Sequence, residues 1–204
     1  MAYPIHFDVH LSERQSRLTT FFRLILVIPH LIVLTLWSIL IPFTTFIAWF
    51  AILFTGRYPQ ALFNFGLAFL SYSTRVSCYL YLLTDRFPPF GGGSSADGHP
   101  VQVSAELPEH LSRLTTFFRL ILAIPAYLVM YVLQLLGRLL AFFAWFVIIF
   151  TGRLPKGLFE VMELPQRYQT RTTGYLLLLT DAYPWFQEET LPDPDPWTGP
   201  VPEN

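Results

Sequence analysis

Two long apolar stretches dominate the pattern of hydrophobic and polar positions in this chain. No Asp, Glu, Lys or Arg occurs from Leu24 to Phe54, and Arg138 is the one charged residue from Leu120 to Phe150. Each stretch has 31 residues, 24–54 and 120–150, whereas a single transmembrane helix needs about 20. We therefore expect each stretch to form a transmembrane helical hairpin, with its turn at Pro42 in the first and at Gly137–Arg138 in the second.

An alternating pattern precedes each apolar stretch. Apolar side chains take every second position from Ile5 to Leu11 and again from Val101 to Leu107. A period of two residues predicts a short, half-buried extended strand. We therefore expect a strand before each hairpin.

The two halves of the chain are copies of one unit. The eleven residues from Ser16 to Leu26 recur letter for letter as Ser112 to Leu122, and the other matches keep the same offset of 112 − 16 = 96. Features that both copies keep are the ones that a shared fold requires. Features found in one copy only cannot be essential to a mechanism that both share.

The expected helix ends also recur in pairs. Ser16 and Ser112 are good N-caps for the first helix of each unit, and Gly56 and Gly152 are typical helix stops. The first helix of each unit contains a proline that should kink it, and these prolines are Pro29 and Pro125.

A third segment follows each apolar stretch, at Ala61–Leu83 and at Gly157–Leu179. The first of these could pass for a membrane span, but the second contains charged residues such as Glu160 and Glu163. Since copies of one unit should agree, we expect both segments to be interfacial amphipathic helices on the cytoplasmic surface. The predicted fold class is thus an all-α integral membrane protein of two tandem repeats, each with a short N-terminal extended strand, a transmembrane helical hairpin and an interfacial amphipathic helix.

Four segments follow from this organisation. The first membrane repeat covers residues 1–90 and the second covers 99–186. Between them, the Gly/Ser-rich residues 91–98 are expected to form a flexible linker. The acidic, Pro-rich residues 187–204 are expected to form a disordered tail.

Composition and charge support a membrane location. The chain is 53% hydrophobic and only 13% charged, against about 25% charged in a typical soluble domain. In the two-hairpin arrangement, every one of the 13 Lys and Arg residues except Arg138 falls on one side. The positive-inside rule then puts both termini in the cytoplasm. Two repeats with an even number of spans would be related by an axis along the membrane normal.

Three motifs in each copy resemble a known family. The first copy reads SRLTTFFRLILVIP at 16–29, AWFAILFTGRYP at 48–59 and YLYLLTDRFP at 79–88, and the second copy repeats these patterns. They resemble the membrane family catalogued as domain of unknown function 4389, which is common in actinobacteria and often tandem. The second copy departs from the usual ending, with Trp185 where the first has Pro89. The resemblance implies a small multi-helix protein of the bacterial inner membrane and implies no activity.

The residues that could carry chemistry are few. His6, Asp8 and His10 would share a strand face, but about 13 Å separates the two histidines and the second copy lacks them, so no metal site is expected. His30 lies in an apolar stretch, where an ionisable residue suggests function; its counterpart is Ala126, which favours a neutral, packed histidine over a shared proton relay. We expect no enzyme activity, no cofactor and no nucleic-acid partner.

The charged residues that both copies keep are four arginines and two acids per unit. Asp85 and Asp181 are candidates for structural ion pairs, with Arg23 and Arg119 as the favoured partners. The arginines have two open interpretations: topology anchors with internal pairing, or a basic pocket for an anionic lipid headgroup. The headgroup candidates are Arg17, Arg23, Arg57, Arg75, Arg113, Arg119, Arg153 and Arg171.

Two classes of function remain open. The first is a non-catalytic accessory or scaffolding subunit of a larger membrane complex, in contact with anionic lipids and other subunits. The alternative is a transport or channel component, which is disfavoured because the apolar stretches share no polar residues that could line a path.

Overall fold

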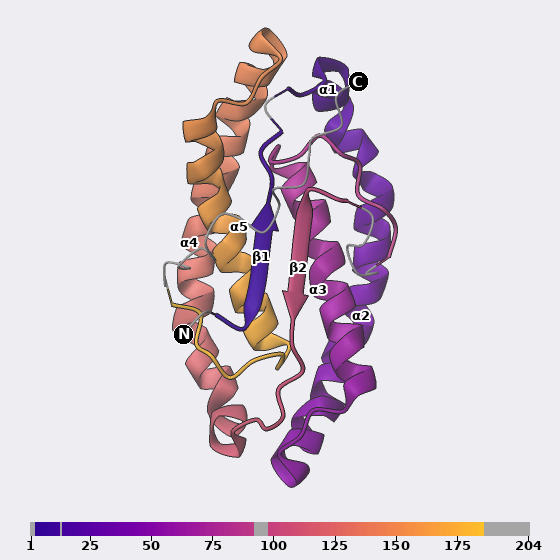
Figure 1. Ribbon diagram of the computed structural model, residues 1–204, viewed down its shortest axis with the longest axis vertical. Helices are drawn as coiled ribbons and strands as arrows, with labels where there is room; N and C mark the ends of the chain where they lie inside the picture. The colour runs from indigo at the N-terminus through magenta and orange to yellow at the C-terminus, as the bar shows by residue number, and fades with distance from the viewer. Residues whose placement is uncertain (1–2, 13, 92–97, 186–204) are drawn as a thin grey trace, which may run out of the picture.

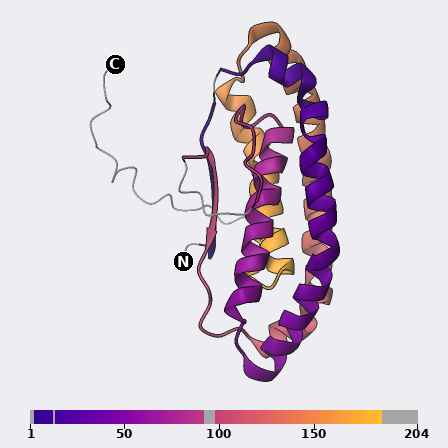
Figure 2. The ribbon, with the colours of Figure 1, turned by 90° about the vertical axis from the view of Figure 1, so that its right-hand side faces the viewer.

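The computed structural model describes residues 3–12, 14–91 and 98–185. Most of the expected linker at 91–98 and all of the expected tail at 187–204 lie outside these residues. The described chain is arranged in three layers, which are seen edge-on in Figure 2. A two-stranded sheet forms one outer layer, two helices form the middle layer, and the two long helical segments form the other outer layer (Figure 1).

The sheet confirms the two predicted strands and joins the two repeats. Strand β1 (Ile5–Val9) pairs antiparallel with β2 (Val101–Ala105). Phe7 lies opposite Val103 at the centre of the register. In β1 the apolar side chains are buried and the polar ones exposed, as the alternating pattern predicts. The strands therefore cover the middle layer with their apolar face.

The long outer helices contradict the expected hairpins. In the first repeat, α1 (Arg17–Leu26) leads directly into α2 (Ile28–Thr55), and in the second, α4 (Arg113–Thr151) is a single helix of 39 residues. No turn forms at Pro42, because α2 continues through it. Gly137 is helical and buried, and a Cβ there would lie 3.3 Å from both Pro165 and Tyr81. This glycine therefore permits close packing against the middle layer and makes no turn.

The predicted helix ends are correct. The Ser16 and Ser112 hydroxyls each accept a hydrogen bond from the backbone N–H three residues on, as N-caps do. Gly56 and Gly152 end the long helices with φ near +71° and +72°, a conformation that glycine adopts without strain.

The prolines expected to kink the long helices, Pro29 and Pro125, lie in different local surroundings, and the kinks themselves stay a prediction. The first long helix is interrupted at Val27, just before Pro29. By contrast, α4 runs through Pro125 without interruption. The two copies therefore differ in the continuity of the helix beside the proline.

The third segment of each repeat is a helix of the middle layer. Helices α3 (Gln60–Leu80) and α5 (Lys156–Leu176) pack against each other, against the long helices and beneath the strands. The sequence correctly predicts a helix here. The expected use of its apolar face to lie on a membrane is wrong, because that face packs on protein: Tyr72 and Tyr79 of α3, for example, are fully buried.

Each repeat completes the other. Strand β2 of the second repeat packs on α3 of the first, and β1 of the first packs on α5 of the second. The Trp49 indole donates to the backbone carbonyl of Thr116, and the equivalent Trp145 donates to that of Thr20. These reciprocal contacts are those of a twofold pair. Because Phe7–Val103 in the sheet and α3–α5 beneath it meet at equivalent positions, the pseudo-twofold axis runs through the layers, close to the line of view in Figure 1.

Candidate functional site

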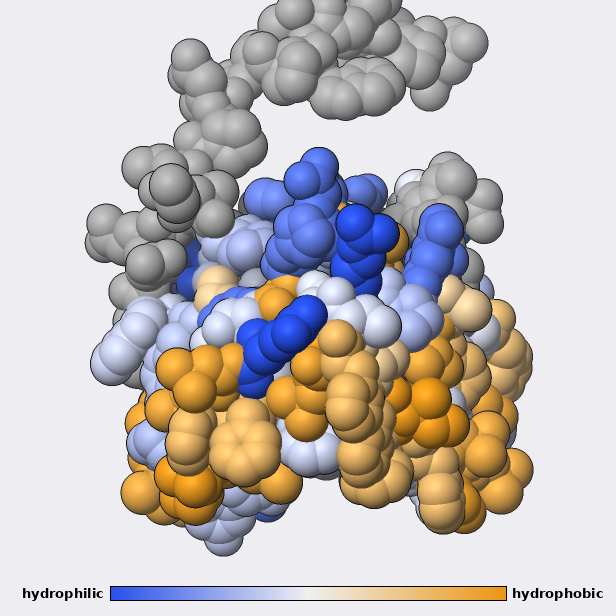
Figure 3. Space-filling view, turned by 90° about the horizontal axis from the view of Figure 1, so that it is seen from below, coloured by the Kyte–Doolittle hydropathy of each residue, from blue (hydrophilic) through white to orange (hydrophobic). Residues whose placement is uncertain are grey.

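The apolar outer face of the long helices is the most prominent surface feature. Most of α1, α2 and α4 is exposed, and only 11% and 22% of the residues in their most apolar windows are buried. Large side chains such as Phe43 (67% exposed) and Leu120 (77% exposed) point away from the protein. Both long segments are long and apolar enough to cross a membrane. Figure 3 shows that apolar residues gather on this side and hydrophilic ones on the side of the strands.

Arg23, in the last turn of α1, joins this helix to the end of α3. Its side chain is 2% exposed, and its Nη1 donates to the carbonyls of Tyr79 (2.7 Å) and Thr84 (3.1 Å). The guanidinium also lies 4.5 Å from the centre of the Tyr79 ring. A cation at the last carbonyls of a helix satisfies groups that have no helical partner and complements the helix dipole.

Asp85 completes this connection. Its Oδ1 lies 2.9 Å from Arg23 Nη2, and its Oδ2 accepts from the Ser16 backbone N–H at 3.0 Å. The carboxylate thus neutralises the buried arginine and extends the N-cap of α1. Because the Arg23 side chain is almost completely shielded from water, its positive charge depends on the Asp85 carboxylate for compensation.

The second repeat builds the same network. Arg119 is 2% exposed and donates to the carbonyls of Tyr175 and Thr180. Asp181 binds both Arg119 and the Ser112 N–H. The structure therefore places each acid beside the arginine that the repeat pattern favoured.

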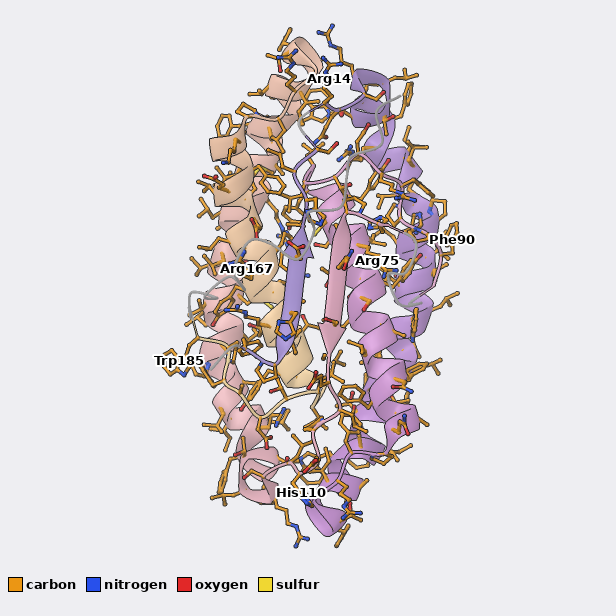
Figure 4. All side chains as sticks on the ribbon, in the orientation of Figure 1. Arg14, Arg75, Phe90, His110, Arg167 and Trp185 are labelled. Atoms are coloured by element: carbon orange, nitrogen blue, oxygen red, sulfur yellow. The ribbon has the colours of Figure 1, made fainter. Side chains whose placement is uncertain are left out.

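This geometry excludes four arginines from an exposed headgroup site. Arg23 and Arg119 are enclosed in the networks above. Arg75 and Arg171 are each 3% exposed because they lie in the middle layer. The Arg171 guanidinium lies 4.8 Å from the centre of the Tyr3 ring. Figure 4 shows Arg75 beside β2. The prediction that these four arginines bind headgroups is wrong because all four are buried. The sequence of one repeat does not show that the strands cover the middle layer.

The other four candidates are exposed and lie at the ends of the long helices. Arg17 donates to the Phe150 carbonyl at 3.0 Å, and Arg14 forms a backbone bridge with Arg153. At the opposite end, the Arg113 side chain lies beside Gly56. Arg14 and His110, which are equivalent positions, mark the two ends in Figure 4. The exposed arginines therefore form two clusters, Arg17 with Arg153 and Arg57 with Arg113.

Arg138 does not lie at a hairpin tip, as the two-hairpin arrangement required. It is exposed within α4 and interacts electrostatically with Tyr81, which follows α3. The guanidinium thus reaches from the long-helix layer toward the middle layer.

His30 is packed among aromatic rings. It is fully buried, its Nδ1 lies 2.7 Å from the Tyr72 hydroxyl, and it stacks on Phe90 with ring centres 4.4 Å apart. This environment supports the interpretation as a packed residue of the first repeat. Within the described residues, no group of three His, Cys, Asp or Glu side chains could hold a metal ion.

Burial shifts the pKa of two other side chains, Cys78 and His99. Cys78 is buried, which raises the pKa of its thiol and disfavours the reactive thiolate. Burial chiefly, with Arg75 and Arg86 nearby, lowers the pKa of His99, although its bond with the Val101 backbone acts in the opposite direction.

Sequence reasoning missed some members of the arginine networks. Gln15 donates to the Leu82 carbonyl at 2.6 Å and faces Arg23. Its counterpart in the second copy is Leu111, so comparison of the two copies could not identify Gln15 as a member of the network. The Tyr79 and Tyr175 rings beneath the arginines could have been found, because both copies keep a tyrosine five residues before Thr84 and Thr180.

Comparison with known proteins gives one family. The family model described as Domain of unknown function (DUF4389) matches residues 17–91 and again residues 113–188. These two matches coincide with the two repeats. No curated protein and no solved structure matches the chain.

Proposed function

The chain belongs to the DUF4389 family, a domain of unknown function that it contains twice, and we propose that it is a non-catalytic membrane protein that works by contact. In this proposal it is an accessory or scaffolding subunit of a larger membrane complex. The observation that carries the proposal is the exposed apolar face of α1, α2 and α4. Soluble monomers rarely expose apolar patches larger than a few hundred Å², so this face requires lipid or protein to cover it.

The charged residues that both repeats keep support a contact role. Arg23 with Asp85, and Arg119 with Asp181, hold helix ends together and are engaged within the protein. The exposed pairs at the two ends of the long helices suit anionic lipid headgroups, because arginine binds phosphate through two donors. We place the protein on the cytoplasmic leaflet of the bacterial inner membrane, whose anionic lipids attract such residues.

Native mass spectrometry of the endogenous protein, extracted in mild detergent, tests the proposal. The expected result is a defined complex with other membrane subunits and bound anionic lipid. A bare monomer with neither lipid nor partner would contradict it. Specific solute flux in proteoliposomes would favour a transport component instead.

The lipid contacts have their own test in vesicles that contain anionic lipid. Each cationic side chain near such a surface contributes about 1 kcal/mol, so replacing four should weaken binding by up to about 10³-fold at low salt. The variant changes Arg17, Arg57, Arg113 and Arg153 to Gln, and the matched control changes the same four to Lys. The control should keep most of the binding, and equal loss in both variants would show that charge attraction is not the cause.

A further inference from the structure

We infer that the molecule lies flat in one leaflet, with α1–α2 and α4 parallel to the membrane plane and their outer face on the acyl chains. This inference rests on the proposed membrane role and adds which surface meets the lipid and in what orientation. The pseudo-twofold axis then coincides with the membrane normal. The middle helices and the sheet lie above the lipid, on the aqueous side.

The length of the helices is the first argument. The 31 apolar residues from Leu24 to Phe54 extend about 46 Å at ~1.5 Å per residue. A hydrocarbon core of about 30 Å would accommodate them only at a tilt of about 50°, beyond the usual range of about 0–40°. A helix that lies in the interface has no such limit on its length.

The polar face of the protein is the second argument. The sheet exposes His6, Asp8, Gln102 and Ser104, and α5 exposes Glu160. Because the sheet lies beside the middle of the long helices (Figure 2), a spanning orientation would place this face and the outer edges of both strands at membrane depth. Unpaired strand edges and exposed charges are not tolerated in hydrocarbon. Lying flat keeps all of them in water.

The third argument is the position of the exposed arginines. The long helices of the two repeats are related by the pseudo-twofold axis, so Arg17 and Arg153 lie at one end and Arg57 and Arg113 at the other. Spanning helices would put one cluster on each side of the membrane, and the positive-inside rule would then select no orientation. In the flat orientation both clusters lie at the rim of the apolar face, level with the headgroups. This is the charge complement of an anionic leaflet.

Arg138 fits the same arrangement. It is the one charged residue in the apolar part of α4, and it interacts electrostatically with Tyr81, which follows α3 in the neighbouring layer. A long arginine side chain near apolar surface directs its charged group toward water in this way. Tyr81 also packs against Gly137, the residue before Arg138, on the side of α4 that faces the middle layer.

Single cysteines at Gln60 and Lys156 distinguish the orientations. The two positions are equivalent and exposed, and they begin α3 and α5 at opposite ends of the bundle. Each cysteine is introduced into full-length Cys78→Ala protein and treated with a membrane-impermeant maleimide in spheroplasts and in inside-out vesicles. Labelling after solubilisation serves as the folding and reactivity control.

The flat orientation predicts that Gln60→Cys and Lys156→Cys label in the same preparation, the inside-out vesicles. Labelling of one in spheroplasts and of the other in inside-out vesicles would overturn it and establish spanning helices, while leaving the proposed membrane role intact. Release of the protein by carbonate as a soluble dimer would overturn both, because a second copy and not lipid would then cover the apolar face.

Discussion

The hydroxyl oxygens of Thr74 and Thr170 lie 3.2 Å apart at the crossing of α3 and α5. These residues are counterparts, since 170 − 74 = 96, so the pseudo-twofold axis passes between them. A residue meets its own counterpart only where two equivalent units share one centre. The core of this protein is therefore formed between the repeats as well as within each one.

The shared core predicts that the two repeats stay together when the chain is cut. A protease site inserted between Gly91 and Gly98 should be cleaved without separation of the halves, because the sheet, the α3–α5 contact and the two tryptophan bonds all cross between them. Size-exclusion chromatography in detergent measures this. Elution of two separate fragments under native conditions would show that each repeat folds alone.

Loss of the Asp85 carboxylate should leave Arg23 buried without its counter-charge. Removing one partner of a buried pair costs about 3–5 kcal/mol, and we expect the lower end because 23% of the Asp85 side chain is exposed. For a chain of this size that loss lowers the melting temperature by about 6–12 °C. The control Asp8→Ala removes a largely exposed acid and should change the free energy of unfolding by less than about 0.5 kcal/mol. Equal melting temperatures for Asp85→Ala and Asp8→Ala would refute the pairing.

Two glycines of α5 should respond to alanine with opposite signs. A Cβ at Gly174 would lie 2.1 Å from the Ile5 side chain of β1, whereas one at Gly157 meets nothing within 4 Å. Gly174→Ala should therefore destabilise by about 1–3 kcal/mol through overpacking. Gly157→Ala should stabilise by up to about 1 kcal/mol through helix propensity. Thermal denaturation of both variants in detergent measures the difference, and stabilisation by both would contradict the close approach of β1 to α5.

His99 should make the fold less stable in mild acid. Its pKa is lowered in the folded protein, so below about pH 6.5 the unfolded chain takes up a proton that the folded one does not. The stabilisation is complete above this pH and is lost as the pH falls through the folded pKa, by at most about 1.4 kcal/mol per pH unit. His99→Tyr, which copies Tyr3 of the first repeat, should show a weaker fall in melting temperature between pH 7.5 and 5. Parallel pH profiles for the two proteins would exclude this role.

The sequence predicted those features that depend on local chemistry or on the repeat. Alternation at Ile5–Leu11, the serine N-caps and Gly56 and Gly152 each have a local physical cause, and the structure contains all of them. The partners of Asp85 and Asp181 could be named because both members of each pair recur.

The prediction of hairpins is wrong because two short helices and one long helix have the same hydropathy pattern. In the second repeat the continuous helix is accompanied by the packing of Gly137 against Pro165 and Tyr81, a contact between distant segments. The burial of Arg75 and Arg171 has a similar cause: each lies in the middle layer, beneath the sheet that the two repeats build together. No pattern within one repeat contains that information.

The depth of α4 in the membrane tests the central claim most directly. Nitroxide labels at Leu120, Leu128, Phe142 and Phe150, all exposed along the helix, can be located by electron paramagnetic resonance with oxygen and a water-soluble nickel complex as relaxants. If α4 lies flat in one leaflet, all four labels have nearly the same shallow depth. A profile in which Leu128 and Phe142 lie near the bilayer centre while Leu120 and Phe150 lie near opposite surfaces would contradict the account.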